Sequence, residues 1–583
     1  MSAPASRAGA WPIIRAYWVS PDSGPGWRLL AAVIALDLAL VWRAARITYW
    51  QKDFYDTLQK MDEAAFWPLL AMLVLLALTG LVLSTARTWL AQSLEMRWRA
   101  WMTDVYLKRW LAGSAFWRLE REQHPAGSSV ENVDQRLAED LRMLASDTLS
   151  LSLGLLSNFV SLFTFSAIVW SMSGVLSITL GGASFEVPGY MLWVALIYAA
   201  GGSWLMEKIG GRMVAIDYRQ QQAEADFRTA LMRIRESAEQ IALYGGGHAE
   251  HARLTALFDA VKHNWRDIMV YTKRITITDN AYTEAGALVP YVLQGPRVLK
   301  GIITMGDLIQ LTQSFMRVRV ALSWFIYKYK SLALLRSALA RLAEFDAALQ
   351  ADEAASNHTQ DNAQDSAARV PHITRQSGSA TDGYTLQDVQ ALGPRGQALT
   401  PVVNWRIAPG ERWMLRGPSG AGKSTLLRAL AGLWTHGHGH IATPPGAAAA
   451  PRAETLFVPQ QSYLPIDTLR ACLAYPALET AFSDDDCQAA LRWACLPALT
   501  HRLHESAHWA RQLSPGEQQR LAFARIWLHR PRWLFLDEAT SALDEETEER
   551  LYTRLTRDLP GLTLVSIAHR SSLRRFHEHE MQL

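Results

Sequence analysis

The chain has 583 residues, a length that predicts several domains rather than one. Its formal net charge of +3 is too balanced for a typical nucleic-acid-binding protein, which carries a marked basic excess. Charged residues make up 19% and hydrophobic residues 49% of the chain, whereas soluble proteins average about 25% charged residues. The three cysteines, Cys472, Cys487 and Cys495, lack paired ligand spacing, which argues against a disulfide framework and a zinc site.

The first half of the chain contains apolar stretches of about 20 residues, the length that a membrane-spanning helix needs. The stretch at 66–85 is nearly free of charge, whereas the last two are weaker because they include Glu284, Arg317 and Arg319. The 23 tryptophans suit a protein with many membrane–water boundaries. We therefore predict six spans, at 29–50, 66–85, 149–170, 190–206, 280–299 and 308–332.

Charged residues inside the predicted spans have two interpretations. In the first, Asp37, Arg43 and Glu284 line a polar path through the membrane. In the second, they form structural ion pairs or mark the end of a span whose position differs from the predicted one. The sequence leaves both interpretations open.

Arginine and lysine in the connecting segments predict the orientation, because cytoplasmic loops of membrane proteins carry an excess of both. Residues 87–146 and 208–274 are rich in arginine and have helical patterning, so we expect cytoplasmic helices that continue past the membrane. Residues 51–65 contain only two lysines against four acids, and residues 171–189 contain no lysine or arginine. We expect both of these segments outside, and the N-terminus in the cytoplasm.

A change of composition separates the membrane half from the rest of the chain. Residues 351–382 are dominated by Asn, Gln, Asp, Ser and Thr, which predicts a flexible tether. We therefore expect three parts: an all-α transmembrane domain with six helices over 1–345, a linker over 346–382, and an α/β domain of the P-loop class over 383–583.

The clearest motif lies between a predicted strand at 412–416 and a predicted helix at 425–430. Its glycines let backbone amides turn inward around phosphate oxygens, and the helix N-terminus adds a field that favours an anion. Lys423 is placed to reach the β- and γ-phosphates, and Ser424 to bind Mg²⁺. The segment matches G-x4-G-K-[ST] in full and predicts a nucleotide site made by Gly417, Pro418, Ser419, Gly420, Ala421, Gly422, Lys423, Ser424 and Thr425.

Two acids follow an apolar run later in the chain. Residues 533–536 are Trp, Leu, Phe and Leu, a pattern typical of a buried parallel strand that ends at the nucleotide. We expect Asp537 to hold Mg²⁺ through water and Glu538 to polarise the attacking water as general base. Together with the phosphate loop, these acids predict an ATPase that binds ATP and Mg²⁺.

Between these two motifs, residues 513–520 read LSPGEQQR, which resembles the signature of the ABC superfamily, LSGGQ followed by QR. Pro515 and Glu517 depart from the commonest form of the signature, whereas Ser514 and Gly516 are kept. In that family the signature serves the nucleotide held by the other cassette. The resemblance therefore implies that Ser514, Gly516 and Glu517 complete a nucleotide site across a homodimer.

The remaining segments typical of the family appear in its usual order. Gln460, in Phe-Val-Pro-Gln, resembles the Q-loop residue that senses Mg²⁺ and water. Asp544, in Ser-Ala-Leu-Asp, resembles the D-loop, and His569, in Ile-Ala-His-Arg, resembles the switch histidine that contacts the γ-phosphate. The resemblance thus implies a catalytic set of Glu538, His569 and Gln460, and Mg²⁺ ligands among Ser424, Gln460 and Asp537.

Two features near the phosphate loop are less typical. The aromatic residue that stacks on adenine in many ABC cassettes is missing near residues 390–394, which leaves the preference for ATP over GTP open. His436, His438 and His440 alternate with glycine. We interpret them as exposed residues of a glycine turn rather than a metal site, because the partner ligands of a closed site are missing.

The resemblance extends into the membrane half. Residues 132–140, NVDQRLAED, resemble a stretch of the SbmA/BacA-like transporters and of the related peroxisomal acyl-CoA half-transporters. The similarity covers nearly all of residues 27–583 and implies an exporter-type membrane fold in the inner membrane, with membrane lipids around it. It also implies import of hydrophilic cargo such as peptides or cobalamin, and the alternative is export of lipids or drugs.

Two other classes agree less well with the sequence. A membrane regulator that uses ATP only as a signal would have a degraded hydrolytic site, yet Glu538 and His569 are both present. A soluble ABC ATPase of repair or translation would need two cassettes and no spans. This chain has one predicted cassette and six predicted spans.

Overall fold

The computed structural model describes residues 10–121, 132–180, 183–358, 371–377, 383–393, 396–444, 454–568 and 570–583. The chain divides into two compact units. The membrane unit consists of Met1–Lys108 and Asn132–Ala347, and the cassette unit of Arg109–Glu131 and Ala348–Leu583. Each unit is described by itself below.

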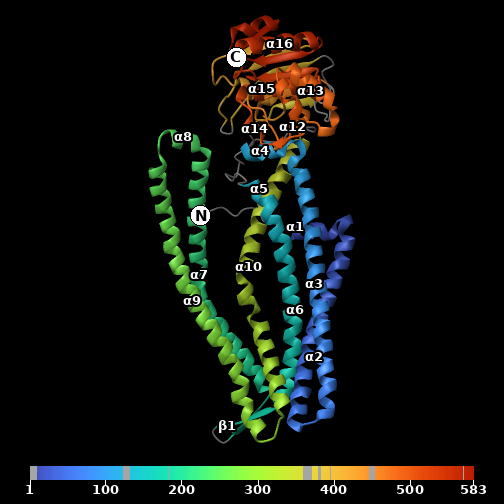
Figure 1. Ribbon diagram of the computed structural model, residues 1–583, viewed down its shortest axis with the longest axis vertical. Helices are drawn as coiled ribbons and strands as arrows, with labels where there is room; N and C mark the ends of the chain where they lie inside the picture. The colour runs from blue at the N-terminus through green and yellow to red at the C-terminus, as the bar shows by residue number, and fades with distance from the viewer. Residues whose placement is uncertain are drawn as a thin grey trace. The chain divides into compact units, whose positions relative to one another are not determined.

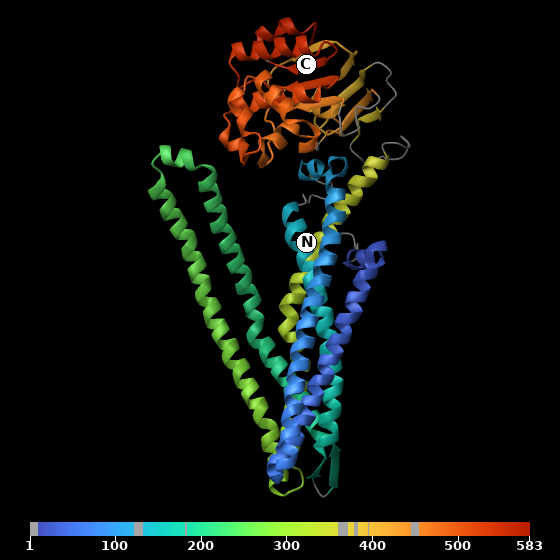
Figure 2. The ribbon, with the colours of Figure 1, turned by 45° about the vertical axis from the view of Figure 1, so that its right-hand side comes forward.

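Six long helices build the described part of the membrane unit (Figures 1 and 2). At 1.5 Å per residue, the 53 residues of the longest helix that lies wholly in this unit span about 80 Å, more than twice the ~30 Å hydrocarbon core of a bilayer. Each predicted span lies inside one helix. In chain order the helices are α2 (Gly24–Lys60), α3 (Glu63–Leu111), α6 (Leu141–Ser173), α7 (Tyr190–Glu236), α9 (Gly247–Leu299) and α10 (Met305–His358).

Shorter elements connect these helices. The short helix α8 (Ala238–Leu243) joins α7 and α9, which run side by side in Figures 1 and 2. Residues 171–189, expected to be a loop, contain an antiparallel hairpin of β1 (Val175–Leu180) and β2 (Ala183–Pro188). The other short elements are α1 (Ala10–Val19), η1 (Pro21–Ser23), α5 (Val133–Gln135) and the single π-helical turn η3 (Arg136–Asp140).

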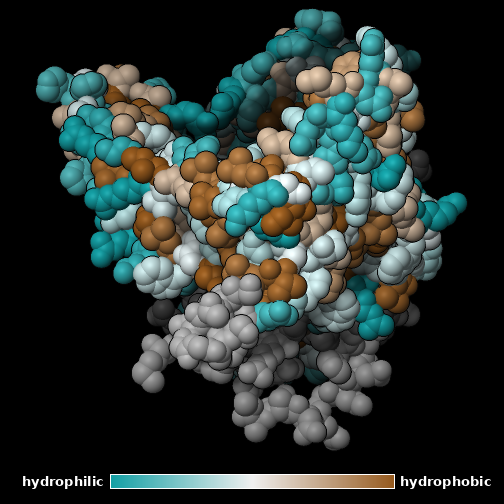
Figure 3. Space-filling view, turned by 90° about the horizontal axis from the view of Figure 1, so that it is seen from below, coloured by the Kyte–Doolittle hydropathy of each residue, from teal (hydrophilic) through white to brown (hydrophobic). Residues whose placement is uncertain are grey.

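The surface of the membrane unit is rich in apolar residues. Two stretches, Glu63–Glu120 and Val133–Ser173, are long and apolar enough to cross a membrane by length and composition alone. Large exposed hydrophobic residues also lie on other helices, for example Trp42 on α2, Ile197 on α7 and Leu288 on α9. Figure 3, which looks onto one end of the molecule, shows apolar residues gathered in brown patches. An exposed apolar surface of this kind suits contact with lipid.

The interior of the membrane unit includes one ion pair from the predicted spans. Arg87 Nε lies 3.0 Å from Asp37 Oδ1, and the Asp37 side chain is only 7% exposed. Arg43 Nε donates a hydrogen bond of 2.6 Å to the Leu76 carbonyl oxygen, so it joins α2 to α3. These contacts favour a structural role for Asp37 and Arg43. Glu284 is exposed on α9.

Two sheets form the core of the cassette unit. The five-stranded sheet has the order β13-β6-β12-β11-β8, and all its neighbouring strands are parallel. The second sheet has the order β3-β7-β4-β5, in which β4 is antiparallel to both of its neighbours. The strands are β3 (Thr374–Ser377), β4 (Tyr384–Ala391), β5 (Val403–Ile407), β6 (Arg412–Arg416), β7 (Gly437–Thr443), β8 (Thr455–Val458), β11 (Trp533–Asp537), β12 (Thr563–Ile567) and β13 (His579–Gln582).

Helices cover the parallel sheet and leave its central strands without exposed residues. Every residue of β12 is buried, as expected for a parallel strand with packing on both faces. Helix α11 (Lys423–Leu430) packs with residues of both sheets in one apolar cluster, whereas α15 (Pro515–His529) and α16 (Glu545–Asp558) contribute to a second. A third cluster joins α12 (Leu469–Ala474), α13 (Asp484–Trp493), α14 (Trp509–Gln512) and α15.

The segment predicted as a linker, 346–382, is ordered in part. Helix α10 continues to His358, and β3 pairs with β7 in the second sheet. The polar composition of 351–358 is compatible with a helix because Ala and Glu have high helix propensity. Asp352 also forms a bidentate ion pair with Arg118 of α4 (Ala115–Arg121), which lies in the same unit.

Candidate nucleotide site

The phosphate loop begins at the carboxyl end of β6, the edge of a parallel sheet where ligands bind. Gly422 has a φ of 87°, and a Cβ atom there would lie 2.2 Å from the Leu399 carbonyl oxygen, so only glycine is accommodated. Helix α11 starts directly afterwards, with its free amides facing the loop. The Lys423 ammonium donates to the carbonyl oxygens of Gly417 and Pro418, at 2.8 and 2.9 Å, so it lies over the loop.

The expected Mg²⁺ ligands Ser424 and Asp537 lie next to each other. Ser424 Oγ donates a hydrogen bond of 3.0 Å to Asp537 Oδ1, which joins the start of α11 to the end of β11. Burial raises the pKa of the Asp537 carboxyl, and the Ser424 hydroxyl opposes that shift. A hydroxyl and a carboxylate oxygen are hard donors of the type that Mg²⁺ prefers, so these residues fit the ion.

The predicted base Glu538 is held in a strained backbone conformation. Its φ is 48°, in the left-handed region that costs a non-glycine residue about 1–3 kcal/mol. The Glu538 amide donates to the Ile567 carbonyl oxygen at 3.1 Å, which fixes the turn after β11. The Gln460 side-chain amide donates to Glu538 Oε2 at 3.2 Å. The structure thus brings two predicted catalytic residues together, whereas the third, His569, lies outside the described residues.

The signature segment forms the N-terminus of α15. Ser514 Oγ accepts a hydrogen bond from the Glu517 amide, and the Glu517 carboxylate accepts from the Ser514 amide at 2.9 Å and from its hydroxyl at 2.8 Å. These bonds hold the pKa of Glu517 below its ordinary value. Pro515 occupies the first helical turn, where its missing N–H has no cost. Of the two departures from the common signature, Glu517 thus completes a capping box with Ser514, and Pro515 is compatible with the helix start.

A residue that was not predicted joins the signature helix to the D-loop. The Gln519 side chain is 7% exposed, donates to Ser541 Oγ at 3.1 Å, and accepts from the Ala542 amide at 2.9 Å. Asp544 follows as the N-cap of α16, where it accepts from the Thr547 amide. Gln519 falls within the signature segment 513–520, but the motif does not reveal this role, because its partners lie more than twenty residues further along the chain.

Among the described residues, no hydrogen bond joins Ser514 or Gly516 to the phosphate loop. The start of α15 lies instead against the D-loop, where a Cβ atom on Gly516 would lie 3.2 Å from the Ala542 carbonyl oxygen. The predicted nucleotide residues thus fall into two groups. One group surrounds β6 and β11, and the other surrounds the start of α15.

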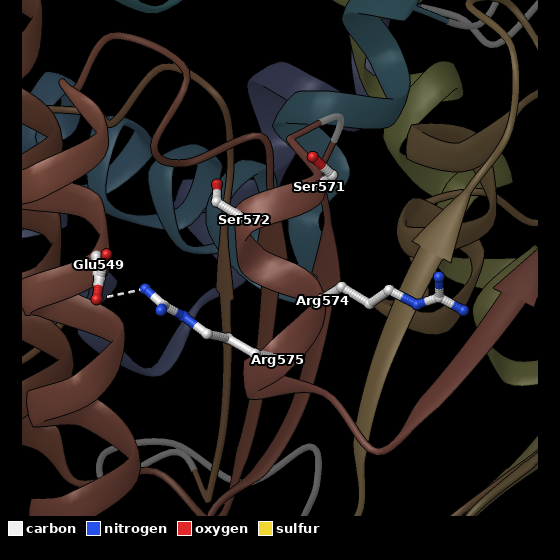
Figure 4. Close-up of a pocket in the computed structure, with 5 residues that line it drawn as sticks. All are labelled: Glu549, Ser571, Ser572, Arg574 and Arg575. Atoms are coloured by element: carbon white, nitrogen blue, oxygen red, sulfur yellow. Dashed lines mark ion pairs between the residues drawn. The ribbon is translucent and has the colours of Figure 1, made fainter.

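Two other features of the cassette unit, the histidines of β7 and a hollow beside α16, contribute no residue to the nucleotide site. His438 and His440 lie in β7, so the turn predicted there is wrong, because β7 pairs with both β3 and β4. A hollow of about 580 Å³ is lined by Glu549, Ser571, Ser572, Arg574 and Arg575 (Figure 4). Arg575 pairs with Glu549 and Arg574 with Glu580, so carboxylates already neutralise both cations.

Comparison with known proteins identifies the family to which the chain belongs. Residues 13–299 match the family profile described as "ABC transporter transmembrane region 2", and residues 401–541 match the profile described as "ABC transporter". The inner membrane ABC transporter ATP-binding protein YddA of Escherichia coli is 31% identical over 96% of this chain and 94% of its own length. The chain belongs to the ABC transporter family.

Relatives of this ABC transporter include members of the D family. The chloroplastic ABC transporter D family member 2 of Arabidopsis thaliana is 28% identical over 97% of this chain and 84% of its own length. The lysosomal cobalamin transporter ABCD4 of Homo sapiens is 25% identical over 96% of this chain and 92% of its own length. These similarities confirm the predicted relation to the D family, with a membrane domain and an ATP-binding domain fused in one chain.

The fold of the transporter also has a solved counterpart. The structure of a bacterial Atm1-family ABC exporter with ATP bound matches with a TM-score of 0.68 and 18% identity, covering 95% of this chain and 93% of that one. The match confirms the predicted fold class, a helical transmembrane domain followed by an α/β ATPase domain. The family match and the curated relatives make the transporter an ATP-binding membrane protein whose cassette is an ATPase coupled to transport.

Proposed function

We propose that this transporter imports hydrophilic cargo, such as peptides or cobalamin, as a homodimer in the inner membrane, with its cassettes and N-terminus in the cytoplasm. Two relatives support the proposal, one named as a lysosomal cobalamin transporter and one as an inner membrane protein. The resemblance of residues 132–140 to the SbmA/BacA-like branch supports the same cargo class. The observation that carries the ATP-driven part is the placement of Gln460 on Glu538 beside the Ser424–Asp537 pair.

The residues of the site have distinct tasks in hydrolysis. The amides at the start of α11 and the Lys423 ammonium bind the phosphates of ATP. Mg²⁺, held by Ser424 and Asp537, would neutralise charge on the β- and γ-phosphates. Glu538 accepts a proton from the attacking water, and the Gln460 amide fixes the orientation of its carboxylate.

The second group of nucleotide residues explains the homodimer. Because Ser514 and Gly516 lie at the start of α15 and not at the phosphate loop, we propose that they contact the ATP held by another copy of the chain. The N-terminal amides of α15 would face the γ-phosphate in that arrangement. Binding of two ATP molecules would then draw two cassettes together and drive the membrane helices between two arrangements.

Export of lipids or drugs is the second candidate. The observation that favours it is the likeness to an exporter of the Atm1 family, in which the fold alone is shared. The two directions differ in which side of the membrane gains cargo, so one vesicle experiment separates them.

The experiment uses the full-length protein in sealed proteoliposomes with labelled cobalamin or labelled peptide outside. ATP sealed in the lumen energises only those transporters whose cassettes face inward, and import into the lumen supports the proposal. ATP supplied only outside energises the opposite orientation, and loading of the lumen in that arm would establish export. ATP turnover without movement of either label would refute the hydrophilic cargo.

Two variants provide the controls for this experiment. Glu538→Gln removes the proposed base and should abolish both turnover and transport. Glu578→Gln makes the same chemical change at an exposed glutamate. Glu578 lies at the opposite end of the parallel sheet, where its backbone amide donates to the Arg412 carbonyl oxygen at the start of β6. This variant should leave both rates unchanged.

A further inference from the structure

An aromatic cluster fixes the N-terminal helix α1 against the membrane unit. The cluster consists of Tyr17 and Trp18 of α1, Trp27 of α2, and Trp98 and Trp101 of α3. The ring centroids of Trp18 lie 5.0 Å from Trp27 and 5.4 Å from Trp98, and Tyr17 stacks on Trp98 at 6.2 Å. Trp27 Nε1 also donates to the Trp18 carbonyl oxygen at 3.1 Å. Helix α1 is therefore packed firmly against α2 and α3.

A cavity of about 390 Å³, which we name the α1 trough, opens beside this cluster. Its lining comes from four helices, α1, α2, α3 and α6, and is mostly apolar, with Ile14, Trp18, Leu30 and Leu149 among its members. The volume lies in the range of small-molecule sites, roughly 300–1,000 Å³. The one charged residue in the lining is Arg15, whose side chain is exposed.

The position of the trough along the chain places it at a membrane boundary. Leu30 and Leu149 stand at the beginning of two predicted spans, next to segments that the arginine content predicts to be cytoplasmic. Tryptophan is enriched at such boundaries, and Trp27 is 52% exposed beside the trough. The trough therefore opens toward the cytoplasmic leaflet, if the proposed orientation holds.

The one charged residue in the lining favours a negatively charged occupant. Arg15 lies in the lining, and Arg97 is a second cation near the cluster. Burial raises the pKa of the Tyr17 phenol, the neighbouring Arg97 guanidinium opposes that shift, and Asp22 adds to it. Basic pockets between membrane helices on the cytoplasmic side bind anionic lipid head groups, because each cation near the surface attracts them.

We propose that the α1 trough is a binding site for one anionic phospholipid of the cytoplasmic leaflet. One acyl chain fills the apolar lining, and the phosphate contacts Arg15. The apolar lining and its membrane boundary favour a lipid over a water-soluble ligand, and Arg15 favours an anionic over a zwitterionic head group. The site is separate from the nucleotide site and does not depend on the cargo or on the direction of transport.

The test uses the full-length protein exposed to equimolar phosphatidylglycerol and phosphatidylcholine, followed by native mass spectrometry to count the lipids retained per protomer. The wild-type protein should retain one phosphatidylglycerol in preference to phosphatidylcholine. Arg15→Gln should reduce that preference about 5-fold, the effect of one cation near the membrane surface. Arg28→Gln is the matched control, because Arg28 is exposed on α2 and does not line the trough.

A second variant tests the cavity rather than the charge. Ser152→Trp places a bulky ring in the lining and should reduce retention of both lipids, whereas ATP turnover in the same preparation confirms that the protein is folded. Equal retention of both lipids by the wild-type protein would overturn the proposal. Equal retention by wild type and Ser152→Trp would also overturn it, since the lipid would then bind outside the trough. If Arg15→Gln and Arg28→Gln behave alike, Arg15 does not bind the head group and the proposal fails.

Discussion

The Gln519 side chain, which joins the signature helix α15 to the D-loop, gives the sharpest prediction about stability. Gln519→Leu keeps the size of the side chain and removes its hydrogen bonds to Ser541 Oγ and to the Ala542 amide. At about 1 kcal/mol for each bond, the cassette should lose about 2 kcal/mol of its free energy of unfolding. For a domain of this size, 2 kcal/mol corresponds to a fall of about 4–8 °C in Tm.

The assay is thermal unfolding of the full-length protein in nanodiscs, with ATP turnover measured on the same samples. Ser541→Ala removes one of the two bonds and should lower Tm by about half as much. In the double variant the effects should be less than additive, because both changes remove the same Gln519–Ser541 bond. A Tm for Gln519→Leu within about 1 °C of the wild type would show that water replaces the bridge, and the structural role assigned to Gln519 would be wrong.

Three further predictions concern single residues or pairs. Lys423→Ala should lower ATP turnover by about 10²–10³-fold, measured as phosphate release, because it removes a cation aimed at the developing charge. Glu517→Gln should lower the cassette's Tm by up to about 4 °C at pH 7, since it loses a charge at a helix N-terminus. The folded pKa of Glu517 is depressed, so this difference in Tm should be present above its ordinary pKa near 4.3 and vanish as the pH falls through the folded value. Asp37→Asn should reduce the yield of folded protein, because it removes the carboxylate that pairs with the half-buried Arg87 guanidinium. Exchange of Asp37 with Arg87 should restore the yield, and a yield that stays low in the exchanged variant would refute the structural role of the pair.

The sequence predicts the phosphate loop and the two acids at the end of β11, because each is a contiguous segment whose function depends on its own backbone conformation. Gly422, Lys423 and Ser424 act through the turn and helix start that they themselves form. The capping role of Glu517 also had a local signal, since Ser-x-x-Glu before an apolar run is the pattern of a capping box. The resemblance to the common signature predicts a role for Glu517 in nucleotide binding and does not predict this cap.

Other features could not be predicted because they depend on contacts across the fold. Gln519 is one of two adjacent glutamines, and nothing in the sequence distinguishes the one that reaches Ser541. The polar composition of 351–358 predicts a linker, but α10 continues to His358, and Asp352 is held there by Arg118 from a distant part of the chain. The hairpin of β1 and β2 has a local signal, since two glycines separate a run rich in β-branched residues, 175–180, from a second short run that contains Phe185 and Val187. The absence of lysine and arginine predicts the side of the membrane on which this segment lies, but not its strands.

The division of the chain into units has a consequence for experiments that exchange parts between transporters. Residues Arg109–Glu131 belong to the cassette unit, and there the Trp117 ring lies 6.5 Å from Trp434. An isolated cassette that starts at residue 383 would lack both this ring and the Arg118–Asp352 pair. Trp434 would then lose this contact, and the fragment would be less stable than the same domain in the whole chain. A chimaera between two relatives should therefore transplant residues 109–131 together with 348–583, as one module encoded in two pieces.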